Sequence, residues 1–335
     1  MVSLKPDANQ IRNVLNALTE DKWIKRTERR WWPRFVFHYT DIKNAVGILR
    51  DGRLYSRQYA ESQGKLKVSS GSSSVLAGTS IAIKDCVRLY FRPKTPTQYY
   101  AEGICSQATL AKSKFRDAHC PVPVFFLFDS TEILSRADCR FSDGGLNSPG
   151  ACILSTAVDL DQLPWKKIYH TGRFNPYAAE QSYIAFRRNA EVIVPRELDL
   201  SVLRYIYCRS EAERETLLHL LPPDLQKRYQ DKIVASTRSD LFYRQQTFVE
   251  TVRLFSKAAY FRFSPETKSP GPFHLQVELE IASSQHSLDA ESFNLERPYI
   301  LEIPLPSSST GYTIRLCLDD HLAYANTYEE IEIPF

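Results

Sequence analysis

The sequence predicts an α+β fold with a C-terminal antiparallel β appendage. Two segments near the start carry apolar residues at helical spacing, and several short apolar runs after them have strand composition. Over the last ~75 residues, alternating strands are separated by Pro- and Ser-rich turns, a pattern typical of a small antiparallel sandwich. At about 150 residues per domain, a chain of this length has room for two domains.

The first predicted element is a short helix, for which Asp7 can act as the N-cap. Its apolar face consists of Ile11, Val14, Leu15 and Leu18. Phe35–Tyr39 has strand composition, and Thr40 can cap a second helix that Gly52 ends. The apolar face of this second helix consists of Ile42, Ala45, Val46 and Leu49. His38 is therefore expected at a strand-to-helix junction, where functional side chains are often held.

Residues 22–34 form a basic and aromatic run between these two helices. The run holds six basic residues, one acidic residue and three of the four tryptophans. Lys and Arg neutralise phosphates, and an aromatic ring can stack on an unpaired base for roughly 1–3 kcal/mol. Two interpretations stay open: a segment that binds single-stranded nucleic acid, or a solvated helix face with Trp31 and Trp32 packed into the core.

The middle of the chain is predicted to alternate loops with short strands. Residues 56–80 have a Ser/Gly-rich centre and no periodicity, which predicts a long loop, and residues 165–188 also resemble a loop. Short strands are predicted at 87–91, 123–128 and 190–194.

Helices are predicted again before the C-terminal strands. Ser210 and Glu213 form a capping box, and Pro222-Pro223 breaks the helix that follows. A further helix is predicted from about Leu225 to Lys257. The C-terminal strands are predicted at 274–281, 301–305, 312–318 and 331–334.

Charge is distributed unevenly along the chain. Residues 1–240 contain 36 Lys/Arg and 26 Asp/Glu, whereas residues 241–335 contain 7 and 13. A basic body with an acidic C-terminal part suggests a polyanionic partner for the first and a different partner, or none, for the second. The alternative is chance segregation between two solvated surfaces. The predicted domains are accordingly 1–240 and 241–335.

Several classes of protein lack their signatures. Seven scattered cysteines form no C-x-x-C pair, which fits reduced thiols in a cytoplasmic protein. No metal site is expected, because no His/Cys/Asp cluster has the spacing of metal ligands. No membrane association is expected either, because the apolar runs fall far short of the ~20 residues that span a bilayer and no signal peptide is evident. Nucleophile-elbow, Walker A and Rossmann motifs are missing from the sequence.

Glu191 and His38 are the first candidates for chemistry. Glu191 lies in an apolar strand that follows a basic loop, so its carboxylate is either solvent-facing on an edge strand or placed at a site. His38 follows Phe35-Val-Phe and is either a satisfied structural histidine or a functional one. Position alone leaves both alternatives open for each residue.

Four segments, in order, resemble the DarT family of NAD-dependent nucleic-acid ADP-ribosyltransferases. Residues 37–54 are similar to the family's opening His motif and its short helix, and residues 87–96 to its "V-P-F-Y-F-N-P-R-S-P". Phe128-Asp-Ser130, followed by Phe141-Ser-Asp-Gly144 and Trp165, resembles its "F-T-D-G" segment and following Trp. Asn189-Ala-Glu-Val-Ile-Val194 resembles its catalytic "Q-A-E-F-L-V". The sequence departs from the family at Arg92 and Lys94, and a Ser/Gly loop replaces an Arg-rich stretch.

The resemblance implies an ADP-ribosyltransferase-like split β core with flanking helices, and it assigns roles to residues. Glu191 becomes the catalytic carboxylate, and His38 a hydrogen-bonding clamp on NAD, which serves as the substrate. The other NAD-binding residues implied are Tyr39 and Thr40, Tyr90 and Phe91 as the lining of the nicotinamide pocket, and Arg92 or Lys94 as the contact to the pyrophosphate. The residues implied to present the target nucleotide are His170, Arg173, Asn175, Tyr177, Arg187 and Arg188.

The predicted function is that of a cytoplasmic toxin that ADP-ribosylates a base in single-stranded nucleic acid, within a toxin–antitoxin or phage-defence system. The resemblance favours DNA, and RNA stays open because a relative in a toxin–antitoxin–chaperone system modifies messenger RNA. An antitoxin is expected as partner, and the acidic C-terminal region offers a place for a chaperone. The alternatives are a protein-directed ADP-ribosyltransferase and a non-catalytic nucleic-acid-binding module.

Overall fold

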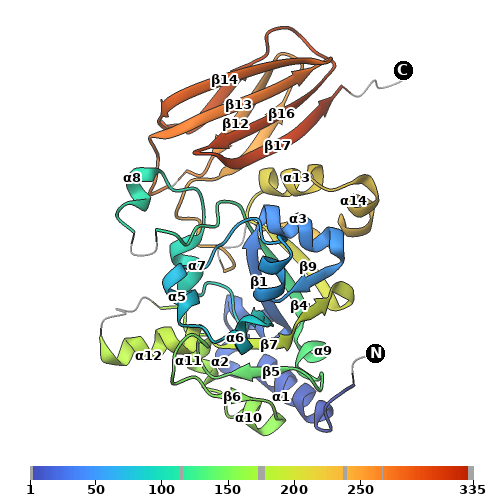
Figure 1. The fold of residues 1–335 in the computed structure, drawn as a ribbon, viewed down its shortest axis with the longest axis vertical. Coiled ribbons are helices and arrows are strands. Elements are labelled where there is room, and N and C mark those ends of the chain that lie inside the picture. The colour runs from blue at the N-terminus through green and yellow to red at the C-terminus, as the bar shows by residue number, and fades with distance from the viewer. Residues whose placement is uncertain (1–2, 114–115, 173–177, 237–239, 266, 331–335) are drawn as a thin grey trace. The chain divides into compact units, whose positions relative to one another are not determined.

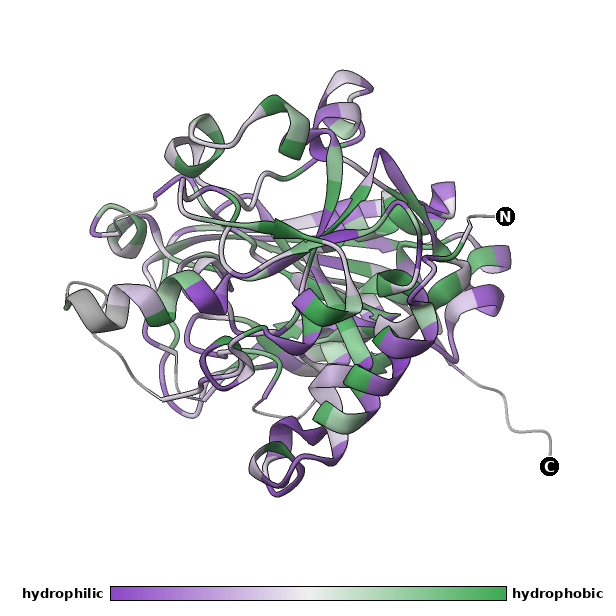
Figure 2. Ribbon diagram, turned by 90° about the horizontal axis from the view of Figure 1, so that it is seen from below, coloured by the Kyte–Doolittle hydropathy of each residue, from purple (hydrophilic) through white to green (hydrophobic). Residues whose placement is uncertain are grey.

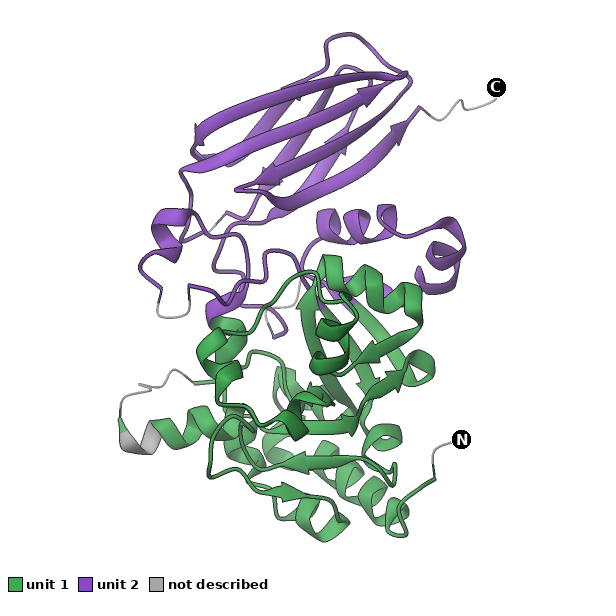
Figure 3. Cartoon of the chain, in the orientation of Figure 1, with its two compact units in different colours: residues 1–99, 125–206 green, residues 100–124, 207–335 purple. Residues whose placement is uncertain are grey.

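The computed structural model describes residues 3–113, 116–172, 178–236, 240–265 and 267–330 (Figure 1). The chain divides into two units, one formed by residues 1–99 and 125–206 and the other by residues 100–124 and 207–335 (Figure 3). The functional boundary predicted after residue 240 falls within the second unit and stays a prediction. None of the helices in the described ranges has the length and apolar character needed to cross a bilayer.

A β-sheet forms the centre of the first unit. Seven of its strands lie in the order β9-β4-β1-β3-β7-β5-β6, and β10 Ile233–Ala235 follows β9 at the edge. Their bounds are β1 Phe35–Asp41, β3 Cys86–Tyr90, β4 Pro123–Asp129, β5 Arg140–Ser142, β6 Ile153–Leu154, β7 Glu191–Pro195 and β9 Leu203–Cys208. A separate antiparallel pair joins β2 Arg53–Tyr55 to β8 Glu197–Asp199. All three strands predicted in the middle of the chain are present, as β3, β4 and β7.

Apolar residues on both faces explain why the central strands are buried. Residues Pro123–Phe128 of β4 are all buried, as expected for a continuous apolar run covered on both sides. Along many of the helices, by contrast, hydrophobic and hydrophilic residues alternate (Figure 2). In α1, Ile11, Leu15 and Leu18 are buried, as the helical spacing predicts.

The helices of the first unit are mostly short. They are α1 Ala8–Glu20, α2 Lys22–Lys25, α3 Ile42–Asp51, α4 Arg57–Ser62, α5 Ser73–Ala77, α6 Ile81–Lys84, α7 Pro96–Ala101, α9 Ser130–Leu134, α10 Ala157–Asp161, α11 Trp165–Ile168 and α12 Ala179–Arg188, with 3-10 helices η1 Glu28–Arg34 and η2 Leu200–Val202. The predicted C-cap of α3 is confirmed, since Gly52 has φ 64° and adopts the left-handed conformation. The predicted N-cap is wrong: the carboxylate of Asp41, not Thr40, accepts from the backbone N–H of Lys43 at 2.9 Å.

The two predicted loops contain helices. Residues 56–80 include α4 and α5, and residues 165–188 include α11 and α12. Three of these helices, α4, α5 and α11, are short enough to escape a periodicity search, which needs two or three turns to register. Side-chain caps help to start some of them, as where the hydroxyl of Ser56 accepts from the backbone N–H of Tyr59.

The basic and aromatic run forms α2 and η1. Trp32 is fully buried, and its ring contacts Tyr169 with centroids 5.7 Å apart. Trp31 is half-buried, and five basic residues of the run are exposed, namely Lys22, Lys25, Arg26, Arg30 and Arg34. The structure therefore supports the packing interpretation for Trp32, whereas the exposed charges leave the nucleic-acid interpretation open.

The second unit contains two antiparallel sheets that share a core. The sheets have the orders β11-β12-β15 and β14-β13-β16-β17. The strand bounds are β10 Ile233–Ala235, β11 Val249–Leu254, β12 Ala258–Phe263, β13 Phe273–Ile281, β14 Ser284–Phe293, β15 Ile300–Pro304, β16 Gly311–Leu318 and β17 His321–Glu329, and the helices are α8 Gln107–Leu110, α13 Glu211–His219 and α14 Pro223–Tyr229. Phe261, Val277 and Ile314 lie in the shared core. The predicted antiparallel β appendage is confirmed, and its expected strand at 331–334 lies outside the described residues.

The helix predicted over 225–257 is wrong. α14 ends at Tyr229, and the strands β10 and β11 lie within the remaining segment. Buried or half-buried residues alternate with others along β11, and its pairing with β12 stabilises it as a strand. That alternation has the period of a strand and is obscured in the sequence by the apolar content of the flanking residues.

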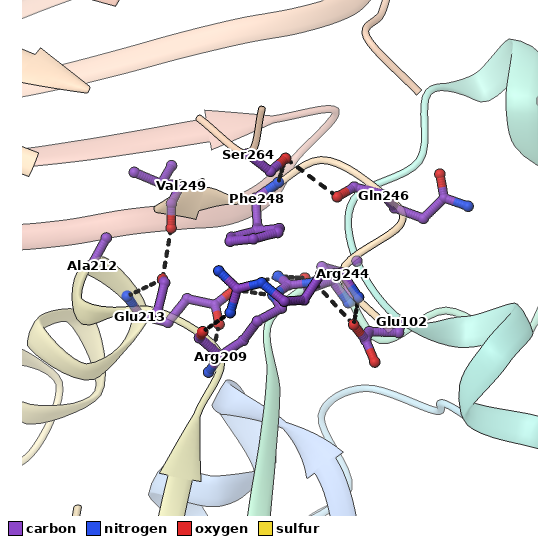
Figure 4. A network of polar contacts seen from close by, with 12 residues as sticks. Glu102, Arg209, Ala212, Glu213, Arg244, Gln246, Phe248, Val249 and Ser264 are labelled. Carbon is purple, nitrogen blue, oxygen red and sulfur yellow. Dashed lines mark hydrogen bonds and ion pairs between the residues drawn. The ribbon is translucent and has the colours of Figure 1, made fainter. Parts of the chain in front are cut away.

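A buried ion-pair network connects distant segments of the second unit (Figure 4). The Arg209 guanidinium is fully buried and pairs with Glu213, while its Nη1 lies 3.9 Å from a carboxylate oxygen of Glu102. Glu102 also accepts from the backbone N–H of Arg244 at 2.7 Å. The Arg209 guanidinium stacks over the ring of Phe248 at 4.2 Å. Because these charges are compensated, the network fixes residues 100–124 within the unit.

Candidate active site

Three residues form a row across the sheet of the first unit. In the antiparallel registers, Phe37 of β1 pairs with Tyr90 of β3, and Tyr90 pairs with Glu191 of β7. Residues opposite each other on neighbouring strands project from the same face. Tyr90 is therefore the immediate neighbour of Glu191, whereas His38, the residue after Phe37, alternates to the opposite face of β1.

The Glu191 carboxylate is buried and held by three N–H donors. Its side chain is only 1% exposed. Arg88 Nε donates to Oε2 at 2.5 Å, and Arg88 Nη2 donates to Oε1 at 2.7 Å. The backbone N–H of Leu146 also donates to Oε1, at 3.0 Å. The solvent-facing alternative is thereby excluded, because β7 lies between β3 and β5 and its carboxylate is enclosed.

Arg88 is the partner that the sequence reasoning missed. Burial acts to lower the pKa of Arg88, but the facing carboxylate outweighs burial, and the pKa is raised above its ordinary value. The two parallel hydrogen bonds are the bidentate geometry that a guanidinium offers to a carboxylate. A signal was present: Arg88 interrupts an apolar strand and shares a strand face with Tyr90, at the spacing of two.

His38 contacts the backbone of Arg88 from the neighbouring strand β1. Its Nδ1 is 3.2 Å from the backbone carbonyl oxygen of Arg88. A carbonyl only accepts, so Nδ1 carries the proton, and in the neutral ring Nε2 is an acceptor. Burial lowers the pKa of His38 to about 4, although the hydrogen bond to Arg88 acts in the opposite direction. The imidazole is thus neutral at physiological pH, with one acceptor nitrogen available for a ligand hydroxyl or amide.

Tyr90 and Phe91, both predicted to line the nicotinamide pocket, have different environments. Burial and then the charge of Glu191 raise the pKa of Tyr90 to about 12, so the phenol is neutral. Phe91 is 2% exposed, and its ring contacts Trp165 with centroids 5.1 Å apart. Tyr90 is placed to contact a ligand beside Glu191, whereas Phe91 belongs to the core behind the strand.

The segment that resembles the family's "F-T-D-G" supports the backbone of Glu191. The hydroxyl of Ser142 accepts from the Glu191 N–H at 3.0 Å and lies 2.6 Å from the carbonyl oxygen of Gly144. A Cβ on Gly144 would lie 2.2 Å from the Phe186 ring, so a glycine is required there by close packing. This segment also positions Leu146, which donates to the carboxylate.

Tyr39 and Thr40, predicted to contact NAD, lie in and beside the core. The Tyr39 ring contacts Phe125 with centroids 5.2 Å apart. Thr40 is 5% exposed, and its hydroxyl accepts from Asn44 Nδ2 at 3.1 Å. Asn44 also bonds the backbone of Val68 and thereby anchors the Ser/Gly-rich segment against α3. A role for Thr40 in NAD binding stays a prediction.

Arg92 and Lys94, predicted to meet the pyrophosphate, differ in accessibility. Arg92 is 1% exposed, donates to the carbonyl oxygens of Ile168 and His170, and stacks over Trp32 at 5.0 Å. This placement gives Arg92 a structural function and does not support a pyrophosphate contact. Lys94 is half-buried and has φ 56°, a conformation uncommon for a side chain of this kind. Lys94 is the better candidate for an anion contact.

The residues predicted to present the target nucleotide are partly engaged within the protein. Arg188 is buried and donates to the carbonyl oxygen of His170 at 2.7 Å. Arg187 forms an ion pair with Asp143. Burial, followed by the charge of neighbouring arginines, lowers the pKa of the half-buried His170. Three further predicted residues, Arg173, Asn175 and Tyr177, lie outside the described residues.

An exposed aromatic residue near these arginines was not predicted. Tyr183 of α12 is 38% exposed, and the ammonium of Lys167 and the guanidinium of Arg187 each lie 4.6 Å from its ring. Aromatic rings flanked by cations are typical of surfaces that contact nucleic-acid bases and phosphates. The sequence signal is a tyrosine among basic residues, within a segment whose composition predicts a loop.

Among the described residues, no group of three His, Cys, Asp or Glu side chains could hold a metal ion.

Comparison with known proteins supplies a family for this arrangement. The family model described as "ssDNA thymidine ADP-ribosyltransferase, DarT" matches residues 37–243, more than half of the chain, and this range includes His38, Arg88 and Glu191. A comparison with curated proteins finds no match.

Among solved structures, the chain is similar to Thermus sp. 2.9 DarT in complex with ADP-ribosylated ssDNA, with a TM-score of 0.49 and 20% identity over 63% of this chain and 97% of that one. It is also similar to Thermus sp. 2.9 DarT in complex with NAD+, with a TM-score of 0.45 and 19% identity over 63% of this chain and 98% of that one. For Thermosipho africanus DarTG in complex with ADP-ribose the TM-score is 0.44 and the identity 18%, over 66% of this chain and 53% of that one. By the extent of the family match, this chain belongs to the DarT family of NAD-dependent ADP-ribosyltransferases that act on thymidine in single-stranded DNA.

Proposed function

We propose that this chain transfers the ADP-ribosyl group of NAD to a thymidine in single-stranded DNA, with Glu191 as the catalytic carboxylate. The observation that carries the proposal is the enclosed Glu191 carboxylate, held by Arg88 and Leu146 beside Tyr90 within the range that the family model matches. Burying a carboxylate costs free energy unless it is paired, and such oriented, enclosed groups are frequent at catalytic sites.

Glu191 suits the charge that develops in this reaction. The bond between nicotinamide and ribose breaks, nicotinamide leaves with the bonding electron pair, and positive charge builds up on the ribose as in glycoside cleavage. A carboxylate fixed by N–H donors stabilises that charge without having to reorient. The thymidine base then forms the new bond to the ribose carbon and loses its proton. Glu191 is the base within reach of that proton.

Tyr90 beside Glu191, and His38 through its contact with the backbone of Arg88, supply groups suited to NAD as the substrate. Neutral His38 presents Nε2 as an acceptor for a ribose hydroxyl or an amide N–H. Tyr90 presents an uncharged ring beside the carboxylate, onto which a nicotinamide ring can pack. Lys94 supplies positive charge for the phosphates, and His170 and Tyr183 lie in the segments that would meet the DNA.

The biological setting of this proposal is a toxin restrained by a partner protein. An enzyme that modifies DNA bases in the cytoplasm harms its own cell, so an antitoxin is required. The exposed strand β14, at the edge of a sheet in the acidic C-terminal region, offers backbone groups to which an antitoxin or a chaperone could add a strand. Growth arrest by the wild-type chain, but not by Glu191→Ala, is the expected outcome of expression without a partner.

The decisive experiment supplies labelled NAD with matched DNA and RNA oligonucleotides of each base. Label is expected on thymidine-containing DNA with the wild-type chain, and it should fall by at least about 100-fold with Glu191→Ala. Glu197→Ala is the matched control, since Glu197 is an exposed glutamate paired with Arg53. Label on protein alone would favour a protein-directed transferase. Salt-dependent DNA binding without any label would favour a non-catalytic module.

A further inference from the structure

A pocket lies in the first unit, apart from the residues that hold Glu191. Its volume is about 450 Å³, within the range of small-ligand sites. The pocket is formed by α1, the end of η1, the start of α9 and β9, and it is lined among others by Arg34, Phe35, Asp129, Arg204 and Tyr205. The family match begins at residue 37, so α1 and η1 belong to an N-terminal segment outside it.

The lining of this pocket combines aromatic rings with charges of both signs, since Glu20 and Asp129 line it beside Arg34 and Arg204. The rings of Phe35 and Tyr205 have centroids 5.8 Å apart, and Tyr205 is 41% exposed. Arg34 and Arg204 are exposed at the same place, although Arg204 already pairs with Asp129 and Glu132. A nucleobase can stack on an exposed aromatic ring, and a guanidinium can bind the adjoining phosphate. The pocket therefore suits one unpaired nucleotide.

Positive charge continues from the pocket along η1 and α2. Lys22, Arg26, Arg30 and Arg34 are exposed in this segment. A DNA strand carries one phosphate about every 3.4 Å, so a row of exposed cations can neutralise several successive phosphates. The burial of Trp32 accounts for one aromatic residue of the run 22–34 but not for its charge. Binding to phosphates would give the exposed basic residues of the run a function.

A line of aromatic contacts connects the pocket with the catalytic strands. The Trp31 ring contacts Phe35 at 5.9 Å and Phe37 at 5.7 Å between centroids. Phe37 is opposite Tyr90, and Tyr90 is opposite Glu191, so these three residues project from one face. Two strand spacings place Phe37 about 10 Å from Glu191. Phe37 is fully buried, so these contacts fix the separation between the pocket and the catalytic strands and are not a surface on which DNA can lie. A strand of a few nucleotides, at about 3.4 Å for each phosphate, is long enough to span that separation.

We propose that the surface formed by Arg30, Trp31, Arg34 and Tyr205, together with the pocket that Arg34 and Tyr205 line, is a second binding site for single-stranded DNA. It holds nucleotides that flank the thymidine at Glu191, and so it favours long single strands over short ones. The inference rests on the proposed function, because the flanking nucleotides belong to the DNA that Glu191 modifies.

The first test compares kcat/KM for two DNA oligonucleotides with the same central thymidine, one of about 5 and one of about 25 nucleotides. The ratio of kcat/KM for the long oligonucleotide to kcat/KM for the short one should fall by roughly fivefold or more in the double variant Arg30→Ala/Arg34→Ala and in Tyr205→Ala. Tyr205→Phe keeps the ring and should restore the ratio. The matched control is Arg253→Ala/Arg262→Ala, which removes two exposed cations from β11 and β12 of the second unit and should keep the wild-type ratio.

A second measurement separates this inference from the proposed function. Anisotropy of a labelled 25-nucleotide DNA on the Glu191→Gln protein reports binding without turnover, and the slope of log affinity against log salt should drop by about 0.7 for each phosphate that the variant no longer neutralises. A wild-type chain that binds through this surface but modifies no DNA would refute the proposed function alone. An active chain whose length ratio and salt slope are unchanged in both variants would overturn the second binding site.

Discussion

Removing the guanidinium of Arg88 should damage both the stability and the activity of the protein. Arg88 makes two charge-assisted hydrogen bonds, of 2.5 and 2.7 Å, to a carboxylate that is 1% exposed. In Arg88→Ala, only the Leu146 N–H remains as a donor to Glu191. Leaving a buried charge without its partner costs about 3–5 kcal/mol, so the free energy of unfolding should fall by that amount.

A double-mutant cycle distinguishes the cost of the orphaned charge from a loss of packing. Arg88→Ala/Glu191→Gln leaves no charge at this pair of positions, so its stability should recover by roughly 1–3 kcal/mol relative to Arg88→Ala. Its transferase activity should stay lost, because the amide cannot stabilise the ribose cation as a carboxylate does. Arg88→Lys keeps the charge but not the bidentate geometry, and it should give an intermediate kcat.

The assay pairs urea unfolding with initial rates on labelled NAD and a thymidine oligonucleotide. Arg136→Ala serves as the control, because Arg136 makes a comparable bidentate contact with Asp138, a carboxylate that is 37% exposed. Removal of such an exposed pair should cost no more than about 1 kcal/mol. The reasoning is refuted if Arg88→Ala unfolds at the wild-type urea concentration with wild-type kcat, since Glu191 would then need no partner.

Three further predictions concern His38 and the second unit. His38→Ala should raise KM for NAD more than it weakens DNA binding, and an equal loss of both would indicate a purely structural histidine. Because burial holds the pKa of His38 at about 4 in the folded chain against 6.5 when unfolded, stability is complete above pH 6.5 and is lost as the pH falls towards 4. The loss is up to about 3 kcal/mol, and His38→Gln should flatten the dependence of unfolding free energy on pH over that window. Glu213→Ala should lower the stability of the second unit by up to about 3–5 kcal/mol, because Arg209 would keep only the Glu102 carboxylate, 3.9 Å away, as a charge partner among the described residues; an unchanged melting temperature would contradict the importance of this ion pair.

Local patterns in the sequence determined much of the fold. Helical spacing identified α1 and α3, and the left-handed Gly52 marked the end of α3. The apolar runs identified β3, β4 and β7, and alternation identified three C-terminal strands. The signals failed where the elements are only one or two turns long, as in α4, α5 and α11, or where a strand was taken for part of a helix, as in β11.

The candidate site, like the fold, could be predicted from the sequence only in part. The order of four short motifs was enough to select Glu191 and His38, because the residue types that the chemistry needs are themselves in those motifs. The partner of the carboxylate could not be read from the motifs, since Arg88 and Glu191 are 103 positions apart and meet only through the register of β3 and β7. The burial of Arg92, predicted to reach the pyrophosphate, was likewise decided by packing against Trp32.

The sequence by itself determined the α+β class and the family and singled out Glu191 as the candidate carboxylate, because each depends on short motifs whose own residues are close together in the chain. Only the tertiary structure decided which charges are buried and paired, which remain exposed at the N-terminal segment, and how residues 100–124 join the second unit. The physical reason is that desolvation and pairing act between residues that are brought together in space, and a linear pattern carries no record of those distances.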